Sequence, residues 1–192
     1  SVSFTPSQVL AMGFAALIVI GTVLLALPAA HEPGESLTLV DAFFTATSAV
    51  CITGLTVVDT AGTFSTFGEI VILLLMQAGG LGIMTLSALM FLLAGRRIGL
   101  HDRLMMQEAL GSFSIAGVVR LTRSIIVATL VIEAIGAVLL ALRFWAYYSP
   151  GQALYFGLFH AVSAFNNAGF DLTSSSMRGF SRDPVVLILV AA

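Results

Sequence analysis

Long apolar runs without charged residues constrain this chain more than any other feature. Residues 9–27 and 70–95 carry no charge, and residues 125–142 carry only Glu133. Each run is close to the roughly 20 residues that an α-helix needs to cross the hydrocarbon core of a bilayer. A fourth run starts after Pro184 and reaches Ala192. These runs predict an all-α membrane protein whose helices span the bilayer at these four places.

The composition excludes several other classes of protein. Hydrophobic residues make up 58% of the chain and charged residues 9%, with a mean hydropathy of +1.05, which does not fit a soluble domain. The eight basic residues are all arginines and the net charge is −2, so a basic surface for nucleic acid is not expected. Cys51 is the only cysteine, which excludes an intrachain disulfide and a cysteine-rich zinc site. Without a P-loop or dinucleotide fingerprint, we expect no organic cofactor in this chain.

Two shorter apolar stretches have a different meaning. Residues 37–50 and 153–165 are too short to cross a bilayer and are typical of re-entrant or buried helices. A glycine-bearing loop follows each one, at 51–55 and at 166–170. With an offset of 115, residues 44–54 and 159–169 are identical at five of eleven positions. We therefore predict a repeated unit of span, short helix, loop and span, with the first repeat and its connector in 1–118 and the second, cut short in its last span, in 119–192.

The physical chemistry of this unit favours a cation pore. Non-helical backbone at membrane depth is tolerated only where it is buried in protein or lines a watery cavity. The half-helix presents the partly negative end of its dipole to such a cavity, and the loop offers carbonyl oxygens that can replace the water around a cation. Glycine allows backbone conformations that a residue with a Cβ resists.

Four longer strings agree in order and spacing with a known family. They are D-A-F-F-T-A-T-S-A-V-C-I-T-G-L-T-V-V-D-T at 41–60, Q-A-G-G-L-G-I-M-T-L-S at 77–87, E-A-L-G at 108–111 and A-V-S-A-F-N-N-A-G-F-D-L at 161–172. They resemble the membrane subunit of Ktr-type potassium transporters, in the Trk/Ktr/HKT superfamily. The resemblance implies four repeats around one pore, K⁺ as the transported ion, Na⁺ as a candidate coupling or activating ion, and a homodimer in the cytoplasmic membrane. It also implies a cytoplasmic nucleotide-binding regulatory ring as partner. Because the chain holds only the first repeat and most of the second, we expect it to be part of a longer product.

The resemblance assigns the filter to the two loops. Gly54 and Gly169 would be the filter glycines, and glycine rather than serine at the first position resembles the potassium-selective pattern. The backbone carbonyls expected to face the ion belong to Ile52, Thr53, Gly54, Leu55, Asn167, Ala168, Gly169 and Phe170. Glycines that only serve tight helix packing are the alternative. Cys51 and Asn166 precede the two filters at equivalent positions, and we expect their side chains to brace the loops.

Charge placement predicts the orientation. The connector 96–123 has an excess of arginine, which marks the cytoplasmic side. Acidic residues gather on the opposite side and could concentrate cations there, although a merely solvated loop is an equal alternative for the first two of them: Glu32, Glu35, Asp41, Asp59 and Glu69. We expect Asp41 and Asp59 to fix loop geometry. Asp171 is followed by Arg178, Arg182 and Asp183, and we expect an aspartate–arginine pairing behind the second filter.

Several residues leave alternatives open. Glu133 in the middle of a span is either an ion or proton relay or part of a structural pair, and we favour the pair. Gly79, Gly80 and Gly82 allow either a bend or close helix packing. A secondary transporter of another solute would also use broken helices. An intramembrane hydrolase built on His160 and Ser163 is disfavoured, because His160 has no histidine at the equivalent position of the first repeat.

Overall fold

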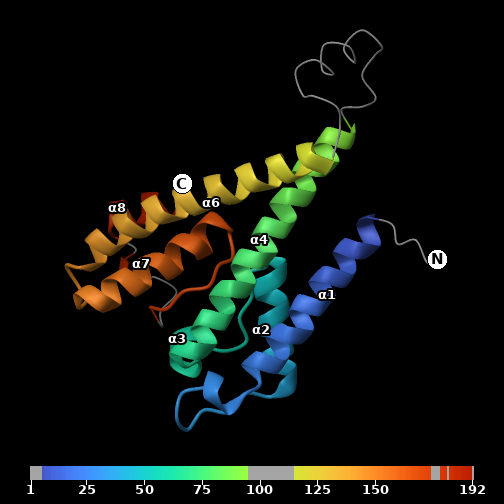
Figure 1. Cartoon of the computed structure of the whole chain (residues 1–192). Coiled ribbons are helices and arrows are strands. Elements are labelled where there is room, and N and C mark those ends of the chain that lie inside the picture. Colours follow the sequence, from blue (N-terminus) through green and yellow to red (C-terminus); the bar gives the residue numbers. More distant parts are fainter. Residues whose placement is uncertain (1–5, 95–114, 174–177, 181, 192) are drawn as a thin grey trace. The chain divides into compact units, whose positions relative to one another are not determined.

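The computed structural model describes residues 6–94, 115–173, 178–180 and 182–191 (Figure 1). Within these ranges the secondary structure is helical, apart from loops and one isolated bridge between His31 and Phe64. The elements in chain order are α1 (Pro6–Leu25), η1 (Pro28–Ala30), α2 (Leu39–Cys51), α3 (Thr60–Thr63), α4 (Thr66–Ala94), α6 (Ile115–Phe144), α7 (Pro150–Phe165), η3 (Arg178–Phe180) and α8 (Pro184–Ala191).

Two helices are long and apolar enough to cross a membrane. They are Thr66–Ser87 of α4 and Val119–Phe144 of α6, with mean hydropathies of 2.0 and 2.7. The first run forms α1, whose apolar part covers Ala11–Leu25. These helices confirm the prediction of an all-α membrane protein. α6 begins at Ile115, ten residues before the apolar run at 125–142, so Arg120 and Arg123 lie on the helix.

The two short helices form where the sequence predicted them, and their starts have local causes. At the start of α2 a capping box forms, in which the Thr38 hydroxyl accepts the main-chain N–H of Asp41 and the Asp41 carboxylate accepts the main-chain N–H of Thr38. α7 begins with Pro150, whose fixed φ suits the first helical position. With 13 and 16 residues, α2 and α7 are shorter than the spans.

The chain forms two compact units. The first combines residues 1–80 with 133–192 and holds both short helices and both loops; the second consists of residues 81–132. In the second unit, the Thr129 hydroxyl lies 3.9 Å from the Met84 sulfur, where it donates a hydrogen bond. This division follows packing, and it differs from the repeat boundary at 118, which follows sequence register.

Within the first unit, α1 packs on α2, and α7 packs on α8 (Figure 1). The contact of each span with its short helix uses the same pair of positions in both repeats. A Cβ built on Gly21 would lie 3.2 Å from the Ala46 side chain, and one built on Gly136 would lie 3.5 Å from that of Ala161. Each pair is 115 residues from its counterpart, so the predicted repeat is visible in the packing as well as in the sequence.

Candidate functional site

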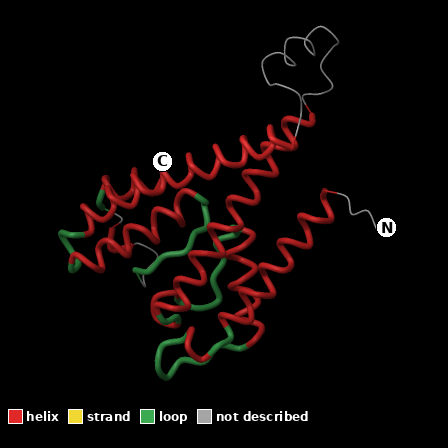
Figure 2. Tube along the Cα trace, viewed as in Figure 1, coloured by secondary structure: helices red, strands yellow, loops and turns green. Residues whose placement is uncertain are grey.

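The loops after α2 and α7 are drawn in green in Figure 2. They share one backbone conformation at two equivalent positions. Ile52 and Asn167 have φ of 56° and 55°, and Gly54 and Gly169 both have φ of 71°. All four values lie in the left-handed region that favours glycine. The matched residues are 115 positions apart, so the repeat extends to the backbone of the predicted filter loops.

A common helix ending produces this conformation. The Thr53 N–H donates to the Ser48 carbonyl at 3.0 Å, and the Ala168 N–H donates to the Ser163 carbonyl at 2.7 Å. A hydrogen bond of this span around a left-handed residue is the Schellman motif, which satisfies carbonyls at the end of a helix. In the first loop the left-handed residue is Ile52, whose β-branched side chain makes this backbone conformation energetically unfavourable. In the second loop it is Asn167, and asparagine tolerates the conformation well.

The two glycines of the predicted filter face each other. A Cβ built on Gly169 would lie 2.8 Å from the Cα of Gly54, and one built on Gly54 would lie 3.3 Å from the carbonyl oxygen of Ala168. Glycine is therefore required at both positions for two reasons: the positive φ, and the close approach of the other loop, which leaves little room for a Cβ. Because both lie in loops, packing between helices does not explain them.

A serine in each short helix braces its loop. The Thr53 hydroxyl donates to the Ser48 hydroxyl at 2.9 Å, and the Ser163 hydroxyl donates to the carbonyl of Phe170 at 2.6 Å. The second bond engages one of the eight carbonyls expected to face the ion, and its partner Ser163 is buried. Thr53, Leu55, Asn167 and Gly169 are exposed, whereas Ala168 and Phe170 belong to the core.

Asn166 is buried behind the second loop, where a polar network holds it. Its side-chain N–H₂ group donates to the Glu133 carboxylate at 3.1 Å and to the Val162 carbonyl at 2.9 Å. The Gln77 amide donates to the other oxygen of Glu133 at 2.9 Å. These bonds tie the Asn166 side chain to α6 and to its own helix, and Glu133 takes the structural partners that we favoured. That Asn166 braces the loop stays a prediction. Cys51 at the equivalent position is an exposed free thiol.

Two consecutive glycines on α4, Gly79 and Gly80, contact the C-terminal ends of the two short helices. A Cβ on Gly79 would overlap the main-chain carbonyl of Val50, and a Cβ on Gly80 would overlap the side-chain oxygen of Asn166. Close packing therefore accounts for these two glycines. Sequence reasoning missed Gln77, although a polar residue inside a charge-free run was a usable signal.

The His160 side chain forms hydrogen bonds to α7 and to the segment that follows the second loop. Its Nδ1 lies 2.7 Å from the carbonyl oxygen of Phe156, and its Nε2 accepts the Leu172 N–H at 3.3 Å. Both contacts are satisfied by a neutral ring that carries its proton on Nδ1. His160 is 2% exposed. With both nitrogens engaged, the histidine packs and bonds locally as expected and is not available as a base for Ser163.

The acidic residues of the predicted outer mouth have separate roles. Asp41 caps α2 and Asp59 caps α3 by accepting the Gly62 N–H, so both fix local geometry as predicted. Glu32 and Glu35 are exposed. Glu69 is buried and accepts the Tyr155 hydroxyl at 2.7 Å, so the expectation that it contributes to an open acidic surface was wrong.

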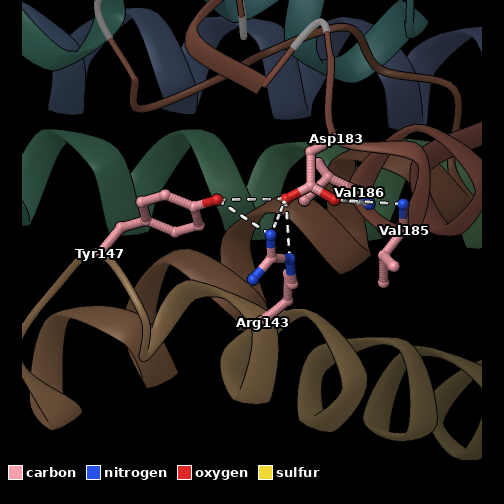
Figure 3. Close-up of polar contacts among 5 residues, drawn as sticks. All are labelled: Arg143, Tyr147, Asp183, Val185 and Val186. Carbon is pink, nitrogen blue, oxygen red and sulfur yellow. Dashed lines mark hydrogen bonds and ion pairs between the residues drawn. The ribbon is translucent and has the colours of Figure 1, made fainter.

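An aspartate–arginine pair forms near the second loop, but its arginine comes from α6; the side chain of Arg178 lies outside the described residues. Asp171 accepts the main-chain N–H and hydroxyl of Thr173, and the observed pair joins Arg143 of α6 to Asp183 before α8 at 2.7 Å (Figure 3). Tyr147 accepts a hydrogen bond from Arg143 and points at the same carboxylate. The Arg143 guanidinium holds the pKa of the Asp183 carboxyl below its usual value.

Much of the arginine-rich connector lies outside the described residues, including Arg96, Arg97 and Arg103. Arg120, on the first turns of α6, is exposed. The orientation that the connector predicts therefore stays a prediction.

Comparison with known proteins identifies the family. Residues 3–192 match the TrkH family, described as cation transport protein. The chain belongs to this family. TrkH-family membership agrees with an ion transporter and argues against the intramembrane hydrolase.

Named relatives are close in sequence. The chain is 44% identical to Ktr system potassium uptake protein B of Bacillus subtilis (strain 168), over 98% of this chain and 42% of the relative. It is 42% identical to the protein of the same name from Vibrio alginolyticus, over 96% of this chain and 40% of the relative. It is 40% identical to the potassium/sodium uptake protein NtpJ of Enterococcus hirae, over 98% and 42%. The chain thus spans about two fifths of the length of these relatives.

Proposed function

We propose that this chain forms part of a potassium uptake pathway across the cytoplasmic membrane, in which loop carbonyls replace the water around the ion. The observation that carries the proposal is the pair of loops, which share left-handed residues at equivalent positions and face each other through Gly54 and Gly169. Membership of a cation transport family and the names of the relatives support it.

In this proposal K⁺ sheds water and is held by carbonyls of the residues assigned above, 52–55 and 167–170. Several weak sites in series allow the ion to leave again, so permeation needs no covalent step. Na⁺ is a candidate coupling or activating ion, which the name of the Enterococcus relative, potassium/sodium uptake protein, supports. The serine braces keep each loop seated on its helix, so that the carbonyls do not have to be ordered when the ion arrives.

The larger organisation is part of the same proposal. Residues 1–118 form the first pore repeat with its connector, and 119–192 form the second. The connector 96–123 faces the cytoplasm and contacts a nucleotide-binding regulatory ring, and the protein works as a homodimer surrounded by membrane lipid. The arginine excess of the connector supports its cytoplasmic placement.

Potassium uptake by bacterial cells that lack their own uptake systems tests the proposal. The protein is expressed from its own gene as wild type, Gly54→Ser, Gly169→Ser and Gly34→Ser. Gly34 is the matched control, because it also has a positive φ, of 98°, but has open space where a Cβ would stand. We expect both filter variants to lose uptake or preference for K⁺ over Na⁺, and Gly34→Ser to retain both. Equal uptake by Gly54→Ser and wild type would overturn the filter assignment.

A further inference from the structure

A buried carboxylate lies behind the second loop, and within the described part of the chain its hydrogen-bond partners are neutral. Glu133 is 4% exposed, and its two oxygens accept hydrogen bonds from the Gln77 amide at 2.9 Å and the Asn166 amide at 3.1 Å. Because amides carry no charge, these contacts leave the negative charge of an ionised carboxylate uncompensated. Burying such a charge is costly, and residues of this kind inside spans usually have a function.

The network touches the filter through one residue. Asn166 is the C-cap of α7, and the next residue, Asn167, is the first of the predicted filter residues. The Asn166 side-chain oxygen is buried without a hydrogen-bond partner and lies against Gly80. The carboxylate of Glu133 is therefore one side chain away from the loop.

The first repeat shows that the loop does not need this network for its shape. Ile18 stands where the second repeat has Glu133, and Cys51 stands where it has Asn166. Nevertheless the first loop has the same φ values as the second, within one degree at both left-handed positions. Since the backbone forms without the network, shaping the loop does not account for the cost of the buried charge.

We propose that Glu133, held by Gln77 and Asn166 behind the second loop, supplies a fixed negative charge that strengthens cation binding in the filter. The inference rests on the proposed function, because it needs a cation in the loop. The charge acts at short range through protein rather than water, so screening by salt is weak. The negative end of the α7 dipole points the same way and adds to it.

The alternative is that the carboxylate is needed only because its two oxygens accept hydrogen bonds from two amide groups. A glutamine at position 133 offers one oxygen, so one of the two amide donors would face an N–H₂ group instead. A purely structural role predicts less protein in the membrane and a lower maximal rate, with an unchanged KM for K⁺. A charge that acts on the ion predicts a higher KM.

The test measures the KM and maximal rate of potassium uptake, with the amount of protein in the membrane determined by immunoblot. The variants are Glu133→Gln, which removes the charge, and Gln77→Glu/Glu133→Gln, which moves the carboxylate to α4 and keeps a carboxylate–amide pair. For Glu133→Gln we expect the KM for K⁺ to rise by about three- to tenfold, as loss of one partly screened charge implies. The exchange variant should return the KM to within about twofold of wild type, since the charge is restored.

The outcomes separate the inference from the function. If Glu133→Gln has the wild-type KM while Gly54→Ser has lost uptake, the inference is overturned and the filter stands. If Gly54→Ser transports like wild type, the proposed function is overturned, and the inference that rests on it is overturned as well. Should Glu133→Gln not accumulate while the exchange variant does, the carboxylate is needed for assembly of the helices rather than for ion binding, and the proposal is overturned. Failure of both variants to accumulate would assign Glu133 to assembly of the helices and also overturn it.

Discussion

Gly80 lies so close to the side-chain oxygen of Asn166 that no Cβ fits between them. Its neighbour Gly79 faces the main-chain carbonyl of Val50 in the same way. One turn of α4 thus contacts the C-terminal ends of both short helices. Each contact lies immediately before the predicted filter loop of that repeat. The relative placement of the two loops depends on these two glycines.

Replacement of Gly79 should be more damaging than replacement of a glycine with open space around it. A Cβ at position 79 meets backbone, which cannot rotate away, whereas at position 80 it meets a side chain that can. We expect Gly79→Ala to lower the free energy of unfolding by about 1–3 kcal/mol, the usual cost of overpacking. Gly13→Ala in α1 is the control, because nothing lies within 4 Å of its Cβ and alanine favours a helix there. Thermal unfolding in detergent measures both, and equal melting temperatures would contradict the packing argument.

The left-handed position of the second loop should reject β-branched residues. Asn167 has φ of 55° and is exposed, so a substitution there changes conformational strain with little change in burial. We expect Asn167→Val to lower the free energy of unfolding by about 1–2 kcal/mol relative to Asn167→Gly. Denaturant titration of the two purified variants provides the comparison. A valine variant as stable as the glycine variant would mean that the loop relaxes to another conformation.

Local pattern predicted the helices and loops of this fold because their causes are local. The lengths of the apolar runs separated spans from short helices, and glycine in register marked both loops. The apolar run at 125–142 marks only part of α6, because Arg120 and Arg123 lie on the helix and arginine stems can lie along an apolar helix near its end. The left-handed Ile52 could not be predicted, because its side chain disfavours that conformation.

Polar partners were harder to predict because they are distant in sequence. Glu133 and Gln77 are 56 residues apart, and Arg143 and Asp183 are 40 apart. No periodicity specifies such pairs; they follow from how helices pack. The arginine partner of Asp183 was not predicted for this reason, since it lies on α6 rather than in the segment after the second loop.

His160 should contribute stability rather than chemistry. His160→Leu leaves the Leu172 N–H without its acceptor in a buried place, and we expect a loss of about 1–3 kcal/mol in the free energy of unfolding. His160→Gln can keep an acceptor and should lose less. Melting temperatures in detergent test this order. Equal stability of the leucine and glutamine variants would show that the bond to Leu172 contributes nothing.

The ion pair between Arg143 and Asp183 should make stability depend on pH in a defined direction. The carboxyl has a folded-state pKa below its usual value, chiefly because Arg143 donates a hydrogen bond to it. A group of this kind contributes stability that is fully present above the unfolded pKa, about 3.9 for aspartate, and is lost as pH falls through the folded pKa. The contribution should therefore be constant from pH 7 to about pH 5 and decline below about pH 4.

Asp183→Asn isolates this effect, because asparagine can still cap α8. In the wild type one carboxylate oxygen accepts the Val185 N–H at 3.1 Å while the other binds Arg143 (Figure 3). The asparagine oxygen can keep the bond to Val185, and only the charge pairing is lost. We expect the melting temperature of the variant to be lower than that of wild type at neutral pH, with the difference shrinking as pH falls below about 4. Arg143→Met should give the same curve, since it removes the other half of the pair. A difference that stays constant with pH would mean that the ionisation of Asp183 does not contribute to stability.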